Sequence, residues 1–118
     1  MRYGKEVLGV DFPSNIWVGI DSQTAAQTTR QLVATPGTGR NLFITDIIIS
    51  NQGTPGSVTL VEDCSGTPKN ISLPIYMGLS TGFAKRFRTP IKATADKNVG
   101  YTSVGVATHG VQINGFTL

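Results

Sequence analysis

The densest pattern of apolar positions in this chain lies between residues 41 and 62. Residues 41–50 combine β-branched and aromatic side chains, which favours a strand over a helix. A period of two divides the large apolar residues between both faces, with Leu42, Ile44 and Ile48 on one and Phe43, Ile47 and Ile49 on the other. Apolar residues on both faces predict a strand that is covered from two sides, by its own sandwich and by a partner subunit.

A turn and a second strand follow this first strand. Gly53, Pro55 and Gly56 end the first strand and turn the chain, and residues 57–62 resume an extended apolar pattern. The pair therefore predicts a hairpin with a long loop.

Further strand patterns occur along the chain, each separated from the next by Gly- and Pro-containing turns. They cover residues 28–34, 70–76, 99–106 and 111–118, and the alternation of Phe83, Lys85 and Phe87 adds another. Pro74 restricts its strand to an edge or a bulge, and the last two strands are joined around His109. Seven or eight strands with this spacing predict an all-β fold, a single β-sandwich over residues 25–118. Jelly-roll-like and immunoglobulin-like connections are both compatible with the pattern.

Residues 1–24 differ from the rest because Gly and Pro interrupt each candidate strand, which predicts an extended N-terminal arm. Trp17 is the single tryptophan, and a large aromatic residue in an irregular segment usually anchors that segment. It packs either on the core of its own domain or on a neighbouring subunit. The candidate interface residues of the arm are Phe12, Ile16 and Trp17.

Composition narrows the function classes. The 118 residues are enough for one domain with a core, and only 14% are charged while 39% are hydrophobic. A net charge of +3 is too small for the footprint of a nucleic-acid-binding protein, so no nucleic-acid partner is expected. No apolar run approaches the length of a membrane span and no signal peptide is visible, so no membrane partner is expected.

Residues able to carry out chemistry are few. Cys64 is the single cysteine, which excludes an intrachain disulfide, and His109 is the single histidine, expected at an exposed hairpin tip. One His and one Cys do not make a zinc site, and no nucleophile or carboxylate is spaced to converge on His109. Glu62 and Asp63 close a strand, where solvated carboxylates are ordinary. We therefore expect no enzymatic activity, no metal site and no cofactor.

One charged segment needs an explanation. Four basic residues occur without an acidic one, interleaved with Phe83 and Phe87: Lys85, Arg86, Arg88 and Lys92. Alternation sends Arg86 to the side opposite Lys85, so the set does not form one patch. Solvated charges that protect an edge strand are one interpretation, and contact with an acidic protein surface is another. For the second, the candidate residues are Lys85, Arg86 and Arg88.

Residues 40–118 resemble a known family in their strand-and-turn phrases. These phrases are Arg-Asn-Leu-Phe-Ile-Thr-Asp-Ile-Ile-Ile-Ser-Asn at 40–51, Val-Thr-Leu-Val-Glu-Asp at 58–63, Leu-Pro-Ile at 73–75, Phe-Arg-Thr-Pro-Ile at 87–91 and Ala-Thr-Ala at 93–95. They are similar to the small β-sandwich decoration, or cement, proteins of tailed bacteriophages. The resemblance implies a structural virion protein that binds the major capsid protein on the capsid exterior as a homotrimer, assembled in the host cytoplasm.

Two other functions stay open beside this one. A tail or fibre module that binds a receptor or glycan would use the same fold, and it predicts that Tyr76 and Tyr101 lie exposed on one surface. A small hydrolase would depend on His109.

Overall fold

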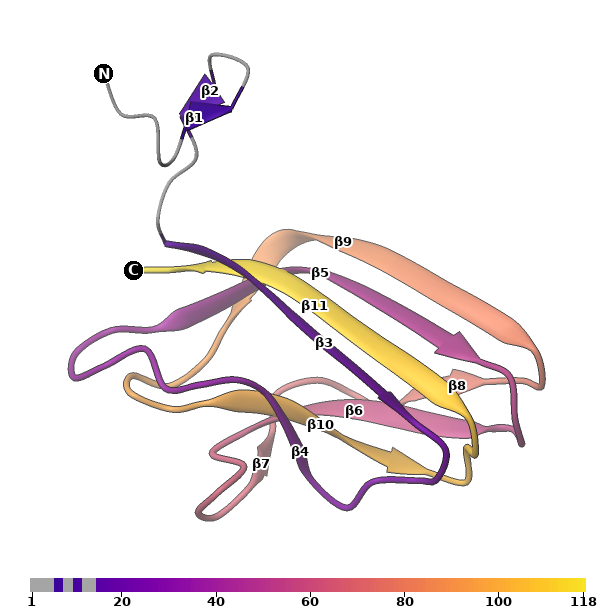
Figure 1. Cartoon of the computed structure of the whole chain (residues 1–118). Coiled ribbons are helices and arrows are strands. Elements are labelled where there is room, and N and C mark those ends of the chain that lie inside the picture. Colours follow the sequence, from indigo (N-terminus) through magenta and orange to yellow (C-terminus); the bar gives the residue numbers. More distant parts are fainter. Residues whose placement is uncertain (1–5, 8–9, 12–14) are drawn as a thin grey trace.

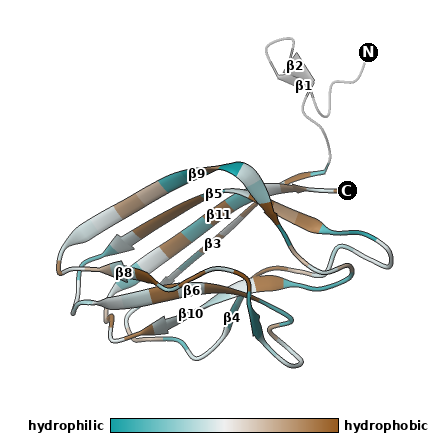
Figure 2. Cartoon of the chain, turned by 180° about the vertical axis from the view of Figure 1, so that it is seen from behind, coloured by the Kyte–Doolittle hydropathy of each residue, from teal (hydrophilic) through white to brown (hydrophobic). Residues whose placement is uncertain are grey.

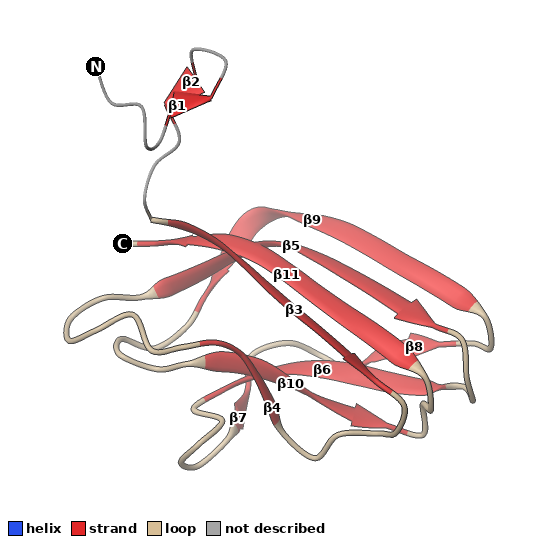
Figure 3. Ribbon diagram, in the orientation of Figure 1, coloured by secondary structure: helices blue, strands red, loops and turns tan. Residues whose placement is uncertain are grey.

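The computed structural model describes residues 6–7, 10–11 and 15–118 of the chain (Figure 1). These residues form strands and loops, with no helix among them (Figure 3). The strands are β1 (Glu6–Val7), β2 (Val10–Asp11), β3 (Ile16–Gln23), β4 (Arg30–Val33), β5 (Leu42–Asn51), β6 (Gly56–Glu62), β7 (Lys69–Asn70), β8 (Ile75–Met77), β9 (Thr81–Lys92), β10 (Val99–Val104) and β11 (His109–Thr117).

Two antiparallel sheets pack face to face as a sandwich (Figure 1). One sheet has the order β3-β11-β5-β9, and the other has the order β4-β10-β6, with β7 and β8 both paired to β6. The pairs β3–β11, β4–β10, β5–β9 and β6–β8 are nested, as if one long hairpin had been rolled up. This nesting is the arrangement of an eight-stranded jelly roll. The expected all-β sandwich is therefore confirmed, and its connections are jelly-roll-like.

The hairpin predicted over residues 41–62 is wrong. Strands β5 and β6 both form, but β5 pairs with β11 and β9, whereas β6 lies in the opposite sheet. The turn between them carries the chain across the sandwich, so both strands bury one face toward the same core. Strands β10 and β11 were also expected to be joined as neighbours, but they lie in opposite sheets.

A β-bulge at Thr45 changes which residues of β5 share a face. In the register with β11, Asn114 lies opposite Asp46 and Gly115 lies opposite Ile44, so Thr45 is the extra residue. The buried positions therefore shift phase, with Leu42 and Ile44 before the bulge and Ile47 and Ile49 after it. The prediction of two equally apolar faces is corrected: one face is the core, and the other keeps only Phe43 and Ile48 as large apolar residues.

The core lies between the two sheets and consists of aliphatic side chains around one buried tyrosine. Hydrophobic bands lie on strands of both sheets, as Figure 2 shows by colour. The buried members include Leu42, Ile44, Ile47, Ile49, Val58, Leu60, Val99, Tyr101, Val111 and Ile113. With one half-buried free cysteine, Cys64, the domain has no disulfide and is held together by this packing.

The arm predicted over residues 1–24 differs from the structure in its second part. Residues 16–23 are strand β3, which pairs with β11 along its whole length from Ile16–Phe116 to Gln23–His109. The sandwich thus begins at Ile16 rather than at residue 25. Before it, β1 and β2 pair with each other as a small two-stranded sheet.

Candidate interaction surface

The face of the β3-β11-β5-β9 sheet that points away from the core is here called the outer face. Strand register arranges its residues in rows that cross all four strands. One row is Ile20, Gln112, Ile48 and Ala84, and the next is Val18, Asn114, Asp46 and Arg86. A third row brings together Ile16, Phe116, Phe43 and Lys92.

Four large aliphatic side chains on this face are exposed to solvent. The exposed fractions are 54% for Ile16, 55% for Val18, 68% for Ile20 and 44% for Ile48. Three of them, Ile16, Val18 and Ile20, occupy alternate positions on β3, at the edge of the sheet. An exposed apolar cluster of this kind with polar neighbours is typical of a protein–protein interaction site.

Two shallow depressions flank Ile48. The first lies over β3, β11 and β5, between Ile20, Ile48 and Gln112. The second lies over β5, β11 and β9, between Ile48, Asn114 and Arg86. Both depressions are open to solvent and are lined by aliphatic, polar and charged side chains.

The third row is held rigid by aromatic packing. The rings of Phe43 and Phe116 stack with their centroids 4.9 Å apart and their planes at 4°. The ammonium group of Lys92 lies 5.9 Å from the centroid of the Phe43 ring, a cation–π distance. This end of the outer face therefore presents a fixed aromatic and basic surface.

The three basic residues predicted as one contact are divided by the sheet. Arg86 lies on the outer face with its Nε 3.5 Å from the Asp46 carboxylate, and its side chain is 86% exposed. Such an exposed pair contributes little to stability and leaves the guanidinium accessible. Lys85 is opposite the buried Ile47 in the register, so it leaves the strand on the other side, and Arg88 is exposed where β9 loses its register with β5. Lys85 and Arg86 thus lie on opposite sides of β9, as strand alternation predicts.

The predicted arm residues are also divided. Phe12 lies outside the described residues. Ile16 is on the outer face, whereas Trp17 points inward and packs against the core of its own domain. The indole ring of Trp17 lies over Gly115 on the neighbouring strand, where a Cβ atom would be 2.5 Å from the ring. Of the two interpretations of Trp17, the structure favours packing on its own domain.

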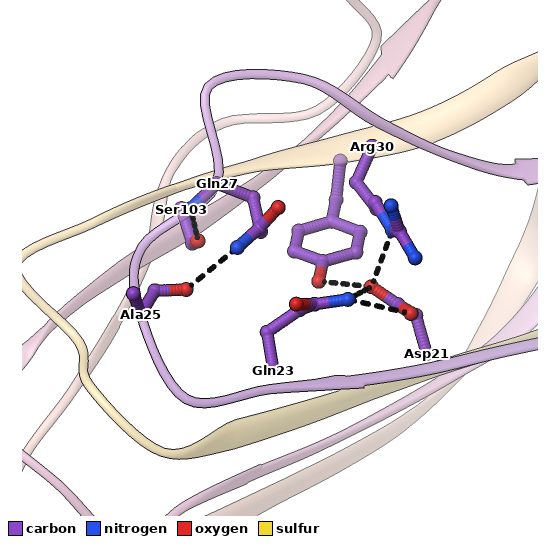
Figure 4. Close-up of polar contacts among 7 residues, drawn as sticks. Asp21, Gln23, Ala25, Gln27, Arg30 and Ser103 are labelled. Atoms are coloured by element: carbon purple, nitrogen blue, oxygen red, sulfur yellow. Dashed lines mark hydrogen bonds and ion pairs between the residues drawn. The ribbon is translucent and has the colours of Figure 1, made fainter.

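A polar cluster connects the two sheets at the edge formed by β3 and β4. The Asp21 carboxylate accepts hydrogen bonds from Gln23 Nε2 at 3.1 Å and Arg30 Nε at 3.1 Å (Figure 4), and from the Tyr101 hydroxyl at 2.7 Å. Burial raises the pKa of Asp21, but these hydrogen bonds outweigh it, so its pKa lies below the ordinary value. Burial and the hydrogen bond to Asp21 raise the pKa of Tyr101, so this hydroxyl stays a donor. The cluster therefore links β3 of one sheet to β4 and β10 of the other through hydrogen bonds.

His109 is not at an exposed tip, as expected from the sequence, but in the interior with 2% of its surface exposed. Its Nδ1 lies 2.6 Å from the Ala107 carbonyl oxygen, and its ring meets the Tyr101 ring edge-on at 5.9 Å. Its Nε2 has no hydrogen-bond partner among the described residues. The hydrolase interpretation needs an accessible base, and this buried ring does not offer one.

The pair of aromatics expected for a glycan-binding module is likewise not assembled. Tyr76 is 79% exposed, but Tyr101 is fully buried in the core. The two side chains therefore do not share a surface.

The described residues offer neither a cluster of metal ligands nor a membrane-spanning helix. Within residues 6–7, 10–11 and 15–118, no three His, Cys, Asp or Glu side chains gather closely enough to hold a metal ion. The same part of the chain contains no helix of the length and apolarity needed to cross a membrane.

Comparison with known proteins gives no family for this chain. No protein-family model matches it, and no curated protein matches its sequence. Solved structures to which this chain is similar include the globular domain of zebrafish complement 1qA, at 9% identity and a TM-score of 0.48. The match covers 86% of this chain and 96% of that domain. The nucleoplasmin-like N-terminal domain of Drosophila FKBP39 gives 7% identity and a TM-score of 0.43, with 89% and 93% covered. The Tobacco streak virus coat protein dimer gives 10% identity and a TM-score of 0.43, with 91% and 89% covered.

Proposed function

We propose that this chain is a structural protein of a bacteriophage particle, which binds the major capsid protein on the capsid exterior as a decoration protein. The observation that carries the proposal is the outer face, where Ile16, Val18, Ile20 and Ile48 are exposed on a rigid sheet beside the Phe43–Phe116 stack. A protein that coats an existing lattice needs such a preformed contact surface and has no need of a deep pocket.

Three further features support this function. The jelly roll is a fold that many viral capsid domains use, which is an argument by analogy of fold. The phrases between residues 40 and 118 that resemble decoration proteins lie largely on β5, β6 and β9 of this roll. The sandwich is stabilised without disulfides, which suits assembly in the reducing host cytoplasm.

The proposal has consequences for partners. The chain contacts capsid protein rather than nucleic acid or membrane, acts without a cofactor, and carries out no catalysis. The resemblance implies a homotrimer, which would match the local threefold axes of a capsid.

The first experiment is the copy number of this chain in purified particles, measured by quantitative mass spectrometry against the major capsid protein. Hundreds of copies per particle are expected for a protein that covers the head. A few to a few dozen copies would instead place it on the tail or a vertex and favour the appendage module. Absence from particles would overturn the virion function.

A further inference from the structure

The two edges of the β3-β11-β5-β9 sheet are built differently. The β9 edge carries Lys85, Arg86, Arg88 and Pro90, the residues that proteins use to prevent edge-to-edge pairing. The β3 edge has no Lys, Arg or Pro over its eight residues, Ile16–Gln23. Its one charge, Asp21, is bound to the Tyr101 hydroxyl and to Arg30 rather than directed against an approaching strand.

Strand β3 is therefore an unprotected edge. Of the strands that the structure describes, only β11 pairs with it. Its outward side chains, Ile16, Val18 and Ile20, are each more than half exposed. An exposed edge of this length and apolarity is a template for pairing with another strand.

We propose that β3 pairs with β3 of a second copy of this chain, antiparallel and about a twofold axis at Val18. Pairing joins the two four-stranded sheets into one continuous sheet of eight strands. In this register Val18 faces Val18 of the partner copy, and Ile16 faces Ile20 of the partner copy. The six aliphatic side chains then form one apolar row across the axis, where cross-strand contacts stabilise a sheet.

The inward-pointing side chains are compatible with the same register. Trp17 is opposite Gly19 of the partner copy, and because Leu32 and Val33 of that copy already lie against Gly19, the indole stays over Gly115 of its own chain. Moving the register by two residues in one direction would bring Trp17 against Trp17, and in the other direction would bring Trp17 against Asp21. Gly19 must also stay a glycine for its own fold, because a Cβ there would lie 2.9 Å from the Leu32 carbonyl oxygen.

This dimer uses Ile16, Val18 and Ile20, three of the four exposed aliphatic residues of the outer face, and leaves the part of that face over β5 and β9 free. Ile48, Ala84 and Arg86 lie on β5 and β9, away from the paired edge, and stay available to a capsid. The threefold symmetry implied by the family resemblance would need another surface, because an antiparallel pair of identical edges is closed by two copies.

Site-specific cross-linking tests the register. In a Cys64→Ser background, Val18→Cys places two thiols opposite each other at a Cα separation of about 4.5–5.5 Å, within the range that a disulfide accepts. Mild oxidation should convert this variant into a covalent dimer. Ile20→Cys alone should not cross-link, whereas a mixture of Ile16→Cys and Ile20→Cys chains should form the mixed dimer. Ile48→Cys, exposed on the same face but away from the edge, is the matched control.

Sedimentation tests the pairing without new thiols. The wild type should sediment as a dimer of the 12.5 kDa chain at high concentration. Val18→Lys should lower the mass to that of one chain, because it places two ammonium groups opposite each other, and Ile48→Lys should stay dimeric. Far-UV circular dichroism checks that each variant is folded.

The proposal is overturned by a wild type that is monomeric at every concentration and forms no Val18→Cys dimer. A trimer that Val18→Lys leaves intact, or equal cross-linking at positions 18 and 48, also overturns it. Particle copy number is measured separately, so a failed dimer and a failed virion function are distinguishable.

Discussion

The hydroxyl of Tyr101 on β10 donates a 2.7 Å hydrogen bond to the carboxylate of Asp21 on β3, and thereby connects the two sheets of the sandwich. Tyr101 is fully buried, and the Asp21 side chain is only 13% exposed. A buried hydrogen bond to a charged acceptor is stronger than one between neutral groups. This bond therefore fixes the β3 strand, and with it the outer face, against the rest of the roll.

Tyr101→Phe should lower the free energy of unfolding by about 1.5–3 kcal/mol, because the ring stays packed while the buried carboxylate loses one donor. Urea denaturation measures the change. Tyr76→Phe removes a hydroxyl from a side chain that is 79% exposed and should leave the free energy unchanged. Equal effects of the two substitutions would contradict the structural role of the Asp21–Tyr101 bond.

Acid should destabilise the protein through Asp21. Its pKa is lower in the folded chain than in the unfolded one, so the unfolded chain binds the proton more readily. The stabilisation is fully present above the unfolded-state pKa, near 4, and is lost as pH falls through the folded-state value. Melting temperatures from pH 7 to pH 2.5 should therefore fall more steeply for the wild type than for Asp21→Asn. Asp96→Asn, at an exposed turn, should keep the wild-type slope.

Gly115→Ala should destabilise the domain by about 1–3 kcal/mol, the usual cost of overpacking. A Cβ at this position would collide with the Phe43 carbonyl oxygen and lie 2.5 Å from the Trp17 ring. Trp17 is the single tryptophan, so its fluorescence reports the displacement of the indole as well as the unfolding. Gly78→Ala is the control, since its Cβ would make an ordinary contact of 3.6 Å with Thr81. Wild-type emission and stability in Gly115→Ala would show that the indole does not depend on this gap.

Ile48→Lys should weaken attachment to capsids at least tenfold while the domain stays folded, because it puts a charge at the centre of the outer face. Binding to particles that lack this protein, followed by co-sedimentation, measures the loss. Val104→Lys changes a valine that is 63% exposed on the opposite sheet and should bind like the wild type. Weakened binding by Val104→Lys with unchanged binding by Ile48→Lys would indicate that the capsid contact lies on the other sheet.

Cys64 should react slowly with iodoacetamide in the folded protein. Burial raises the pKa of its thiol, and the neighbouring charge of Asp63 raises it further, so little thiolate is present at neutral pH. Addition of urea should bring the rate to that of an unstructured cysteine. A folded-state rate already equal to the unfolded rate would show that the thiol is freely accessible.

Strand content and the two-sheet sandwich were predictable because alternation and turn residues are local signals. Pairing was not: residues 41–50 and 57–62 have the pattern of a hairpin, yet their connection crosses between sheets. Alternation shows that each strand buries one face, but it does not show which strand lies beside it. The phase change at Thr45 was equally hidden, since one inserted residue moves Ile47 to the core face while Ile48 turns outward.

Ile16 was predicted as an interface residue, but Val18, Ile20 and Ile48 of the outer face were missed, although the sequence contained a signal. Ile16, Val18 and Ile20 alternate with Trp17 and Gly19, which is a strand period. Nearby Gly and Pro residues led instead to the prediction of an arm. His109 was misplaced for a related reason: a histidine flanked by Thr and Gly has the composition of a turn, and its burial depends on the distant Tyr101 ring.

The pairing of β3 with β11 has a consequence for how the protein is made. The first strand of the roll, starting at Ile16, finds its only described sheet neighbour in residues 109–117. Almost the whole domain must therefore leave the ribosome before this sheet can form. Until then the apolar β3 strand has no β11 to pair with. Contacts between residues so far apart in sequence also make folding slow. Chaperone binding to ribosome-bound chains that end before residue 109 is the expected result.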